Sequence, residues 1–150
     1  GFGLGANVRV RLQQHLSAYG GWEWHRLSSR ELLPAQTTDV EETGYTLGLR
    51  FDHPLRGERA VGRAPSYWLR AGATYAHIEL ESAAGDITFD SGHGLGWEVG
   101  GGLAFPLGDR LTLTPGVRLR SLTRDLGEGA DRASATLRYV TVGTGLVFRF

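Results

Sequence analysis

The sequence contains no cysteine and no lysine, and its net charge is zero. Without cysteine the chain can form neither a disulfide framework nor a thiolate metal site. All 16 basic residues are arginine, and 16 acidic residues balance them. A protein that binds nucleic acid carries an excess of basic side chains on one face. We therefore expect no nucleic-acid partner, and we also expect no cofactor and no bound metal.

Long apolar runs are also missing. No stretch approaches the roughly 18 apolar residues that a transmembrane helix needs, which excludes a helical membrane protein. The first residues do not resemble a signal peptide, so we expect a mature chain or a fragment, organised as a single domain over residues 1–150. Glycine, in contrast, is abundant: 23 of the 150 residues, about twice the usual share.

Alternation of apolar and polar residues dominates the chain and predicts β-strands that each have one apolar face. The expected strands are residues 2–12, 16–25, 44–52, 66–82, 87–107, 111–120 and 139–150. Short turns are expected at residues 13–15, 84–86 and 108–109. Longer loops are expected at residues 28–43, 54–65 and 127–135. The sequence thus predicts an all-β, antiparallel, up-and-down sheet of seven strands, without helix.

The polar faces of these strands do not resemble a face in contact with water. They combine glycine with isolated arginine, glutamate, threonine and tyrosine, and lack the lysine, glutamine and serine that normally cover a solvated sheet. Such a face suits the narrow polar interior of a transmembrane β-barrel, whose apolar face contacts lipid. The charged side chains expected to point inward are Arg9, Arg11, Glu23, Arg50, Asp52, Arg70, Glu98, Arg118, Arg120, Arg138 and Arg149. They could form a plug of paired charges or, in a larger barrel, line an anion-preferring channel.

The aromatic residues of the apolar faces fall into two groups, one near each end of the strands. One end has Phe51, Tyr67, Phe105, Phe148 and Phe150, and the other has Phe2, Trp22, Trp24, Tyr45, Tyr75 and Trp97. The eight residues from Trp97 to Phe105 span roughly 26 Å of strand, or about 20 Å of height when the strand is tilted. Two aromatic girdles that bound an apolar band of this height are typical of a membrane barrel.

The final strand, residues 139–150, alternates apolar residues and ends at Phe148 and Phe150. It resembles the C-terminal assembly signal of bacterial outer-membrane proteins. The hairpins at residues 3–24 and 96–119 resemble the strand–turn–strand unit of the OmpA/OmpX-type small barrel superfamily. The resemblance implies a bacterial outer-membrane location with short periplasmic turns and long extracellular loops. It also implies contact with outer-membrane lipid, lipopolysaccharide and the barrel assembly machinery, with Phe150 at the periplasmic rim.

The number of strands departs from that resemblance. Bacterial single-chain barrels have an even number of strands, whereas this sequence predicts seven. Edge strands in lipid would leave backbone groups unpaired. We therefore expect eight strands in the native protein, with the first one missing from this chain.

One group of residues could carry chemistry. If residues 84–86 form a three-residue turn, His77 pairs with His93 and Glu79 pairs with Ser91, so these four side chains share the outward face near the extracellular rim. A serine, a histidine and a glutamate could form a nucleophile, a base and an orienting group. Two histidines and a glutamate could instead hold a metal.

The group resembles the site of the outer-membrane lipid A deacylases, although their His-x-Ser motif is absent. That resemblance implies a lipid hydrolase. We expect instead that these are polar rim residues and that the protein is not an enzyme.

The remaining polar residues suggest less specific roles. The loop expected at residues 28–43 could bind a partner or bridge cations, or could be solvated, and it contains Arg30, Glu31, Asp39, Glu41 and Glu42. His25 and His53 are expected at the rim or in the interior. The whole pattern predicts an outer-membrane barrel with a non-enzymatic role: envelope structure, surface interaction or limited permeation. The alternatives are a lipid hydrolase and the C-terminal part of a larger anion-preferring pore.

Overall fold

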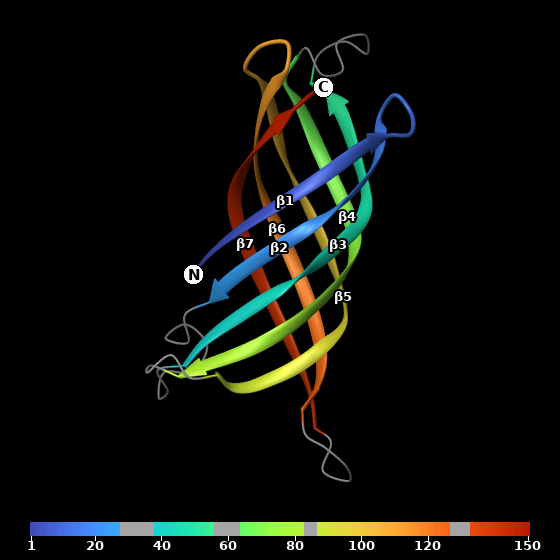
Figure 1. Ribbon diagram of the computed structural model, residues 1–150. Coiled ribbons are helices and arrows are strands. Elements are labelled where there is room, and N and C mark those ends of the chain that lie inside the picture. Colours follow the sequence, from blue (N-terminus) through green and yellow to red (C-terminus); the bar gives the residue numbers. More distant parts are fainter. Residues whose placement is uncertain (28–37, 56–63, 83–86, 127–132) are drawn as a thin grey trace.

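The computed structural model of the chain describes residues 1–27, 38–55, 64–82, 87–126 and 133–150, with side chains at residues 1–27, 40–55, 64–79, 92–123 and 136–150. In these ranges the chain forms seven β-strands (Figure 1). They are β1 (Phe2–Arg11), β2 (Leu16–Leu27), β3 (Thr38–Pro54), β4 (Ser66–Ser82), β5 (Ile87–Pro106), β6 (Leu111–Leu126) and β7 (Ala133–Phe148).

The seven strands form one antiparallel sheet in the order of the sequence, so each strand pairs with its neighbours along the chain. The sheet is curled, with strongly tilted strands and a concave side that encloses a central space (Figure 1). The predicted all-β, up-and-down arrangement of seven strands is confirmed. The described residues contain no helix long and apolar enough to cross a membrane.

Four strands extend beyond the residues that the alternation predicts, and β2 does so by two residues, to Leu27. β3 begins at Thr38, so the prediction of a loop over residues 28–43 is wrong for residues 38–43, while residues 28–37 lie outside the described ranges. β6 continues to Leu126, and β7 begins at Ala133, earlier than expected. The reason is that backbone pairing continues where the side chains turn polar: Glu41 still pairs with Arg26 on one side and with Glu79 on the other.

The two ends of the sheet differ in their connections. The short-turn end has the β1–β2 turn, where the amide of Leu12 bonds the carbonyl oxygen of Leu16 at 2.9 Å, and the β5–β6 turn, where Leu107 bonds Leu111 at 2.8 Å. Gly108 lies in the second turn with φ of 142°, a backbone conformation that favours glycine. The chain also ends here, and the amide of Arg149 bonds the carbonyl oxygen of Arg110. The opposite end is called the long-loop end below.

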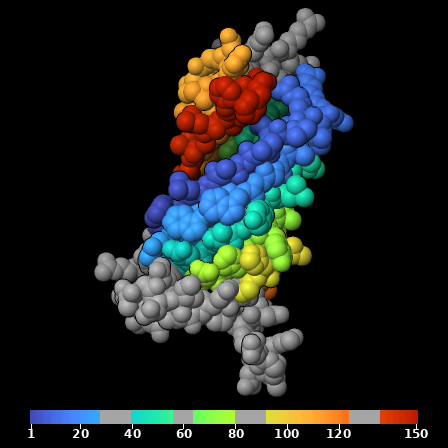
Figure 2. Space-filling view, viewed as in Figure 1, coloured from blue at the N-terminus to red at the C-terminus, as the bar shows by residue number. Residues whose placement is uncertain are grey.

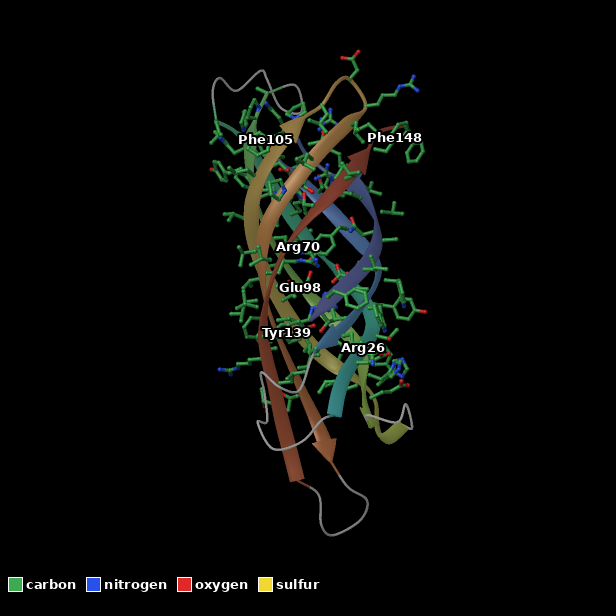
Figure 3. The ribbon with its side chains drawn as sticks, turned by 90° about the vertical axis from the view of Figure 1, so that its left-hand side faces the viewer. Arg26, Arg70, Glu98, Phe105, Tyr139 and Phe148 are labelled. Atoms are coloured by element: carbon green, nitrogen blue, oxygen red, sulfur yellow. The ribbon has the colours of Figure 1, made fainter. Side chains whose placement is uncertain are left out.

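The two faces of the sheet are inverted relative to a water-soluble sheet. Large apolar side chains are exposed on the convex face of every strand, for example Val142 at 81%, Leu95 at 73% and Leu47 at 70%. Charged side chains are buried on the concave face, and Arg70, Glu98 and Tyr139 lie along the middle of the molecule (Figure 3). The described residues therefore pack charged side chains in the core, together with a few apolar ones such as Leu122, and leave most of their large apolar side chains outside.

The concave face also contains a buried tryptophan, Trp68, which sequence reasoning did not place. Trp68 is in phase with Arg70 on β4 and is buried, and its indole nitrogen donates a 3.1 Å hydrogen bond to the carbonyl oxygen of Leu103. A methyl group added at Gly102 or Gly116 would overlap the Trp68 ring. The two facing glycines therefore make room for the indole inside the curl.

The first and last strands are the edges of the sheet. Among the described residues, β1 forms a ladder only with β2, and β7 only with β6. In the space-filling view an opening separates β1 (dark blue) from β7 (red) (Figure 2). The sheet is thus a curled, open one, and the two edges face each other across this opening.

Candidate functional site

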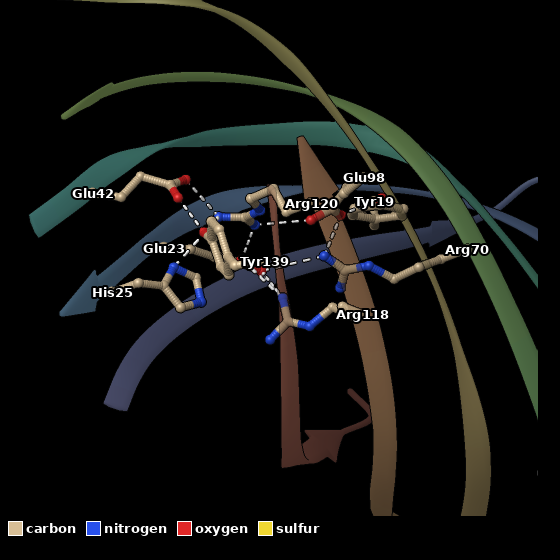
Figure 4. A network of polar contacts seen from close by, with 9 residues as sticks. All are labelled: Tyr19, Glu23, His25, Glu42, Arg70, Glu98, Arg118, Arg120 and Tyr139. Atoms are coloured by element: carbon tan, nitrogen blue, oxygen red, sulfur yellow. Dashed lines mark hydrogen bonds and ion pairs between the residues drawn. The ribbon is translucent and has the colours of Figure 1, made fainter. Parts of the chain in front are cut away.

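The most extensive group of polar contacts lies on the concave face at mid-height, and we call it the central charge network (Figure 4). It joins side chains from six strands, β2 to β7, and consists of Tyr19, Glu23, Glu42, Arg70, Glu98, Arg118, Arg120 and Tyr139. Its three arginines and three glutamates balance each other in charge. The alternation places them here because each is in phase with the inward glycines of its own strand.

Arg120 is the centre of the network. Its Nη1 donates to Glu42 at 2.8 Å and its Nη2 donates to Glu98 at 2.8 Å, and Nη2 also bonds Glu23. Tyr139, on the edge strand β7, donates its hydroxyl to Glu42 on β3. One buried guanidinium therefore links three carboxylates from three other strands, a geometry that the planar fork of arginine donors permits.

The other two arginines of the network contact Glu23 and Glu98. Arg118 Nη1 lies 2.7 and 2.8 Å from the two carboxylate oxygens of Glu23. Arg70 bonds Glu98, lies 3.3 Å from Glu23, and its guanidinium lies 4.6 Å from the centre of the Tyr19 ring. The Tyr19 hydroxyl donates to Glu98 at 2.7 Å. These contacts cross the concave space, so they tie together strands that are not neighbours in the sheet.

Burial makes the pairing of this network essential. Glu42 and Glu98 are each 1% exposed, and Glu23 and Arg120 are each 4% exposed. A buried charge without a partner costs several kcal/mol, and the pair itself contributes less than that because both ions lose hydration. The network is therefore a fixed element of the interior, in which each member depends on the others.

Glu42 was assigned to a solvated loop by sequence reasoning, and that assignment is wrong. Glu42 lies in β3, points inward and accepts from Arg120 and Tyr139. The signal was present in the sequence: Glu42 is in phase with Gly44, Thr46, Gly48 and Arg50. At the start of β3 the outward positions, such as Glu41 and Thr43, are polar as well. The alternation of apolar and polar residues is therefore not visible there.

A second group of charges lies on the concave side nearer the short-turn end. Arg50 holds Asp52 through Nε at 3.0 Å and Nη2 at 2.8 Å, and Arg9 reaches the same carboxylate at 3.3 Å. The Arg50 guanidinium lies 4.7 Å from the centre of the Trp68 ring. Two arginines therefore share one carboxylate here, so this end of the concave face has an excess of positive charge. Of the remaining residues expected inside, Arg11 and Arg138 are exposed and Arg149 is half-buried.

The aromatic residues lie on the convex face near the two ends. Toward the long-loop end, Trp22, Tyr45 and Tyr75 are register partners across three strands, and each is exposed. Trp24, half-buried, packs its ring against Phe2 at 5.1 Å, and Trp97 is 44% exposed. Phe105 and Phe148 lie near the short-turn end (Figure 3), where Phe148 packs against Phe150 at 5.4 Å and Phe51 against Tyr67 at 6.2 Å.

The group proposed for catalysis is only partly assembled. His77 and His93 are direct register partners, as expected, but Glu79 pairs with Asp90, so the expected pairing of Glu79 with Ser91 is wrong. The register shifts because Gly92 has φ of +63° and forms a bulge, a conformation that other residues rarely adopt. Sequence reasoning assumed an uninterrupted ladder. The side chain of Ser91 lies outside the described ranges.

The two histidines and the glutamate contact one another on the convex face near the long-loop end. His77 Nε2 lies 3.1 Å from a carboxylate oxygen of Glu79, and His77 Nδ1 lies 3.3 Å from His93 Nε2. The His93 ring also stacks on Tyr75. Among the described residues no three histidine, aspartate or glutamate side chains are arranged to hold a metal ion together.

The other predicted residues have separate places. His25 is buried beside Arg120, with 3.4 Å between Nη1 and the His25 Nδ1, whereas His53 stacks between His15 and Tyr67 on the convex face. Glu41 lies on the convex face, 3.4 Å from Arg26, and accepts from the indole of Trp24. Arg30 and Glu31 lie outside the described residues, as does the side chain of Asp39.

No protein-family model matches the chain, and no curated protein matches it.

Proposed function

We propose that the protein is an integral β-barrel of a bacterial outer membrane, of the small OmpA/OmpX type, with a non-enzymatic role. The observation that carries this proposal is the inversion of the two faces: exposed large apolar side chains cover the convex side, and ion pairs fill the concave side. In water such a surface would be unfavourable, because contiguous exposed apolar patches of this kind drive association. In lipid the same arrangement is the expected one.

The aromatic rows support the proposal further. Trp22, Tyr45 and Tyr75 form one row toward the long-loop end, and Phe148 lies at the other end of the sheet. Aromatic residues with one apolar and one polar side favour the two membrane–water interfaces. The band between them contains aliphatic side chains such as Leu119 and Val142.

Closure of the barrel requires one more strand between β1 and β7. Both edges would otherwise present unpaired backbone groups to lipid, which costs several kcal/mol for each group. An eighth strand would give the even number that bacterial single-chain barrels have. An eight-stranded barrel has an interior that side chains can fill, which agrees with the buried central charge network.

The arrangement supports a structural or surface-interaction role over transport or catalysis. Arg120 and its three carboxylates cross the concave space where a channel would run. A lipid hydrolase has less support, because the bulge at Gly92 moves Ser91 out of register with Glu79. We infer that the long-loop end faces outward and that the final strand, with Phe148 and Phe150, is recognised during assembly.

The experiment that tests this proposal is heat-modifiable gel mobility of the full-length protein in detergent, followed by conductance in planar bilayers. A compact band before boiling, with little or no conductance, is the expected result. A large, steady, anion-selective conductance would indicate a wider pore and overturn the plugged interior. Good folding in plain buffer, with no folding in detergent or lipid vesicles, would overturn the membrane assignment itself.

A further inference from the structure

The contact between His77 and His93 has no role in the proposed barrel function. The two residues lie directly opposite each other on β4 and β5, on the convex face just beyond the aromatic row that contains Tyr75. His93 is exposed and the side chain of His77 is 19% exposed, so both rings can be reached by a small solute. We propose that His77 and His93 form a two-histidine site for a divalent transition-metal ion of the zinc, nickel or copper type, oriented by Glu79.

The distance between the two nitrogen atoms is the first argument. His77 Nδ1 and His93 Nε2 are 3.3 Å apart. Two imidazole nitrogens bound to one tetrahedral zinc ion, each at about 2.0–2.1 Å, are separated by about 3.3 Å. The pair therefore already has the separation that one ion requires.

The orientation of the rings is the second argument. Their centres are 4.6 Å apart and their planes are inclined by 48°. A head-on hydrogen bond would separate the centres by the nitrogen–nitrogen distance plus two ring radii, which is larger than this. The two nitrogen atoms therefore meet at an angle. Two rings bound to one tetrahedral ion through these atoms would have centres about 5 Å apart, so the rings need to separate by about half an ångström to bind it.

Glu79 supplies the third argument. Its carboxylate lies 3.1 Å from Nε2 of His77, and a carboxylate can only accept from an imidazole N–H. The proton of neutral His77 is therefore held on Nε2, which leaves a lone pair on Nδ1, the atom that faces His93. A carboxylate that fixes the tautomer and orientation of a ligating histidine is a common feature of metal sites.

The remaining coordination positions of the ion are not filled by side chains of the described residues. Among the described residues no third histidine or carboxylate side chain completes the site, so water or an anion would fill the remaining positions. Imidazole ligands favour zinc, nickel and copper over magnesium or calcium, which prefer oxygen. The site depends only on the β4–β5 hairpin, so it does not rest on the proposed membrane location.

The test is titration of the folded protein with Zn²⁺, in detergent or in plain buffer, by isothermal calorimetry. One ion is expected to bind for each chain. His77→Ala and His93→Ala are each expected to weaken binding at least tenfold, and Glu79→Gln by about tenfold or more, because the tautomer of His77 is no longer fixed. Cu²⁺ bound in place of Zn²⁺ is expected to give an electron paramagnetic resonance spectrum with two nitrogen ligands.

The chain provides a matched control in His15 and His53. These rings also stack on the convex face, 5.1 Å apart, but each Nδ1 lies 2.9 Å from a backbone carbonyl oxygen, and no carboxylate of the described part of the chain orients them. The double variant His15→Ala, His53→Ala removes two histidines, one more than each site variant, and is expected to bind Zn²⁺ like the original protein. Gel mobility before boiling checks that each variant is folded.

Three results would overturn the site. The first is unchanged Zn²⁺ affinity in a folded His77→Ala or His93→Ala variant. The second is loss of binding in the folded control variant, and the third is a Cu²⁺ spectrum with a single nitrogen ligand. A chain that folds only in plain buffer but still binds Zn²⁺ through His77 and His93 would refute the membrane assignment while supporting the metal site.

Discussion

The Tyr19 hydroxyl donates a 2.7 Å hydrogen bond to Glu98 across the concave face, which joins β2 to β5 through the interior. The two strands are not neighbours in the sheet. The contact exists only because the sheet curls, and methyl groups at Gly48 or Gly72 would collide with the tyrosine oxygen. It is one of several side-chain links that hold the curl from inside.

Glu98→Gln is expected to destabilise the folded protein by about 3–5 kcal/mol, because Arg70 and Arg120 would lose a buried counter-charge. The measurement is the unfolding midpoint in urea, followed by gel mobility. The matched control is Glu41→Gln on the convex face, whose partner Arg26 is 40% exposed and which should cost less than about 1 kcal/mol. Equal midpoints for Glu98→Gln and the original protein would show that Glu98 does not anchor the network.

Tyr19→Phe removes one oxygen atom and leaves Glu98 without that donor. The expected loss is about 1–3 kcal/mol, the cost of an unsatisfied buried acceptor. Tyr45→Phe, at a ring that is 61% exposed, should change stability by less than about 0.5 kcal/mol. Chemical denaturation of both variants checks the difference, and an equal effect of the two substitutions would contradict the interior role of Tyr19.

Gly116→Ala and Gly143→Ala form a matched pair, because the two glycines are register partners on β6 and β7. A methyl group at Gly116 would overlap the Trp68 ring, whereas one at Gly143 meets no atom within 4 Å. We expect Gly116→Ala to cost about 1–3 kcal/mol and Gly143→Ala to be nearly neutral. The stability of both variants is measured by tryptophan fluorescence during unfolding. A stable Gly116→Ala protein with an unchanged spectrum would mean that Trp68 packs elsewhere.

Val117→Arg tests the proposed lipid contact of the convex face. Val117 is register partner of Gly101, midway between Trp97 and Phe105, so it would lie near the middle of the bilayer. A charge there should cost about 2–4 kcal/mol in lipid vesicles, while Leu107→Arg, in the β5–β6 turn, should cost about 0–1 kcal/mol. Folding yields and unfolding midpoints in vesicles give the comparison. Equal, negligible costs at both positions would place the convex face outside lipid.

The alternation of apolar and polar residues was sufficient to predict which side chains lie on each face of a strand. The seven strands follow from a period of two in apolar residues, and the inward positions of Arg70, Glu98 and Arg120 follow from the same period. The strand ends were less predictable. Beyond the apolar band both faces of β3 become polar, so the signal disappears at Thr38 to Thr43 although the ladder continues.

The sequence by itself determined which residues share a face, because side chains alternate strictly along a strand. Only the tertiary structure decided which of them meet. The pairing of Arg118 with Glu23, 95 positions away, depends on the curl of the sheet, and local spacing contains no information about that curl. The register of Glu79 depends on a bulge at Gly92, since one residue in a left-handed conformation shifts every later pair.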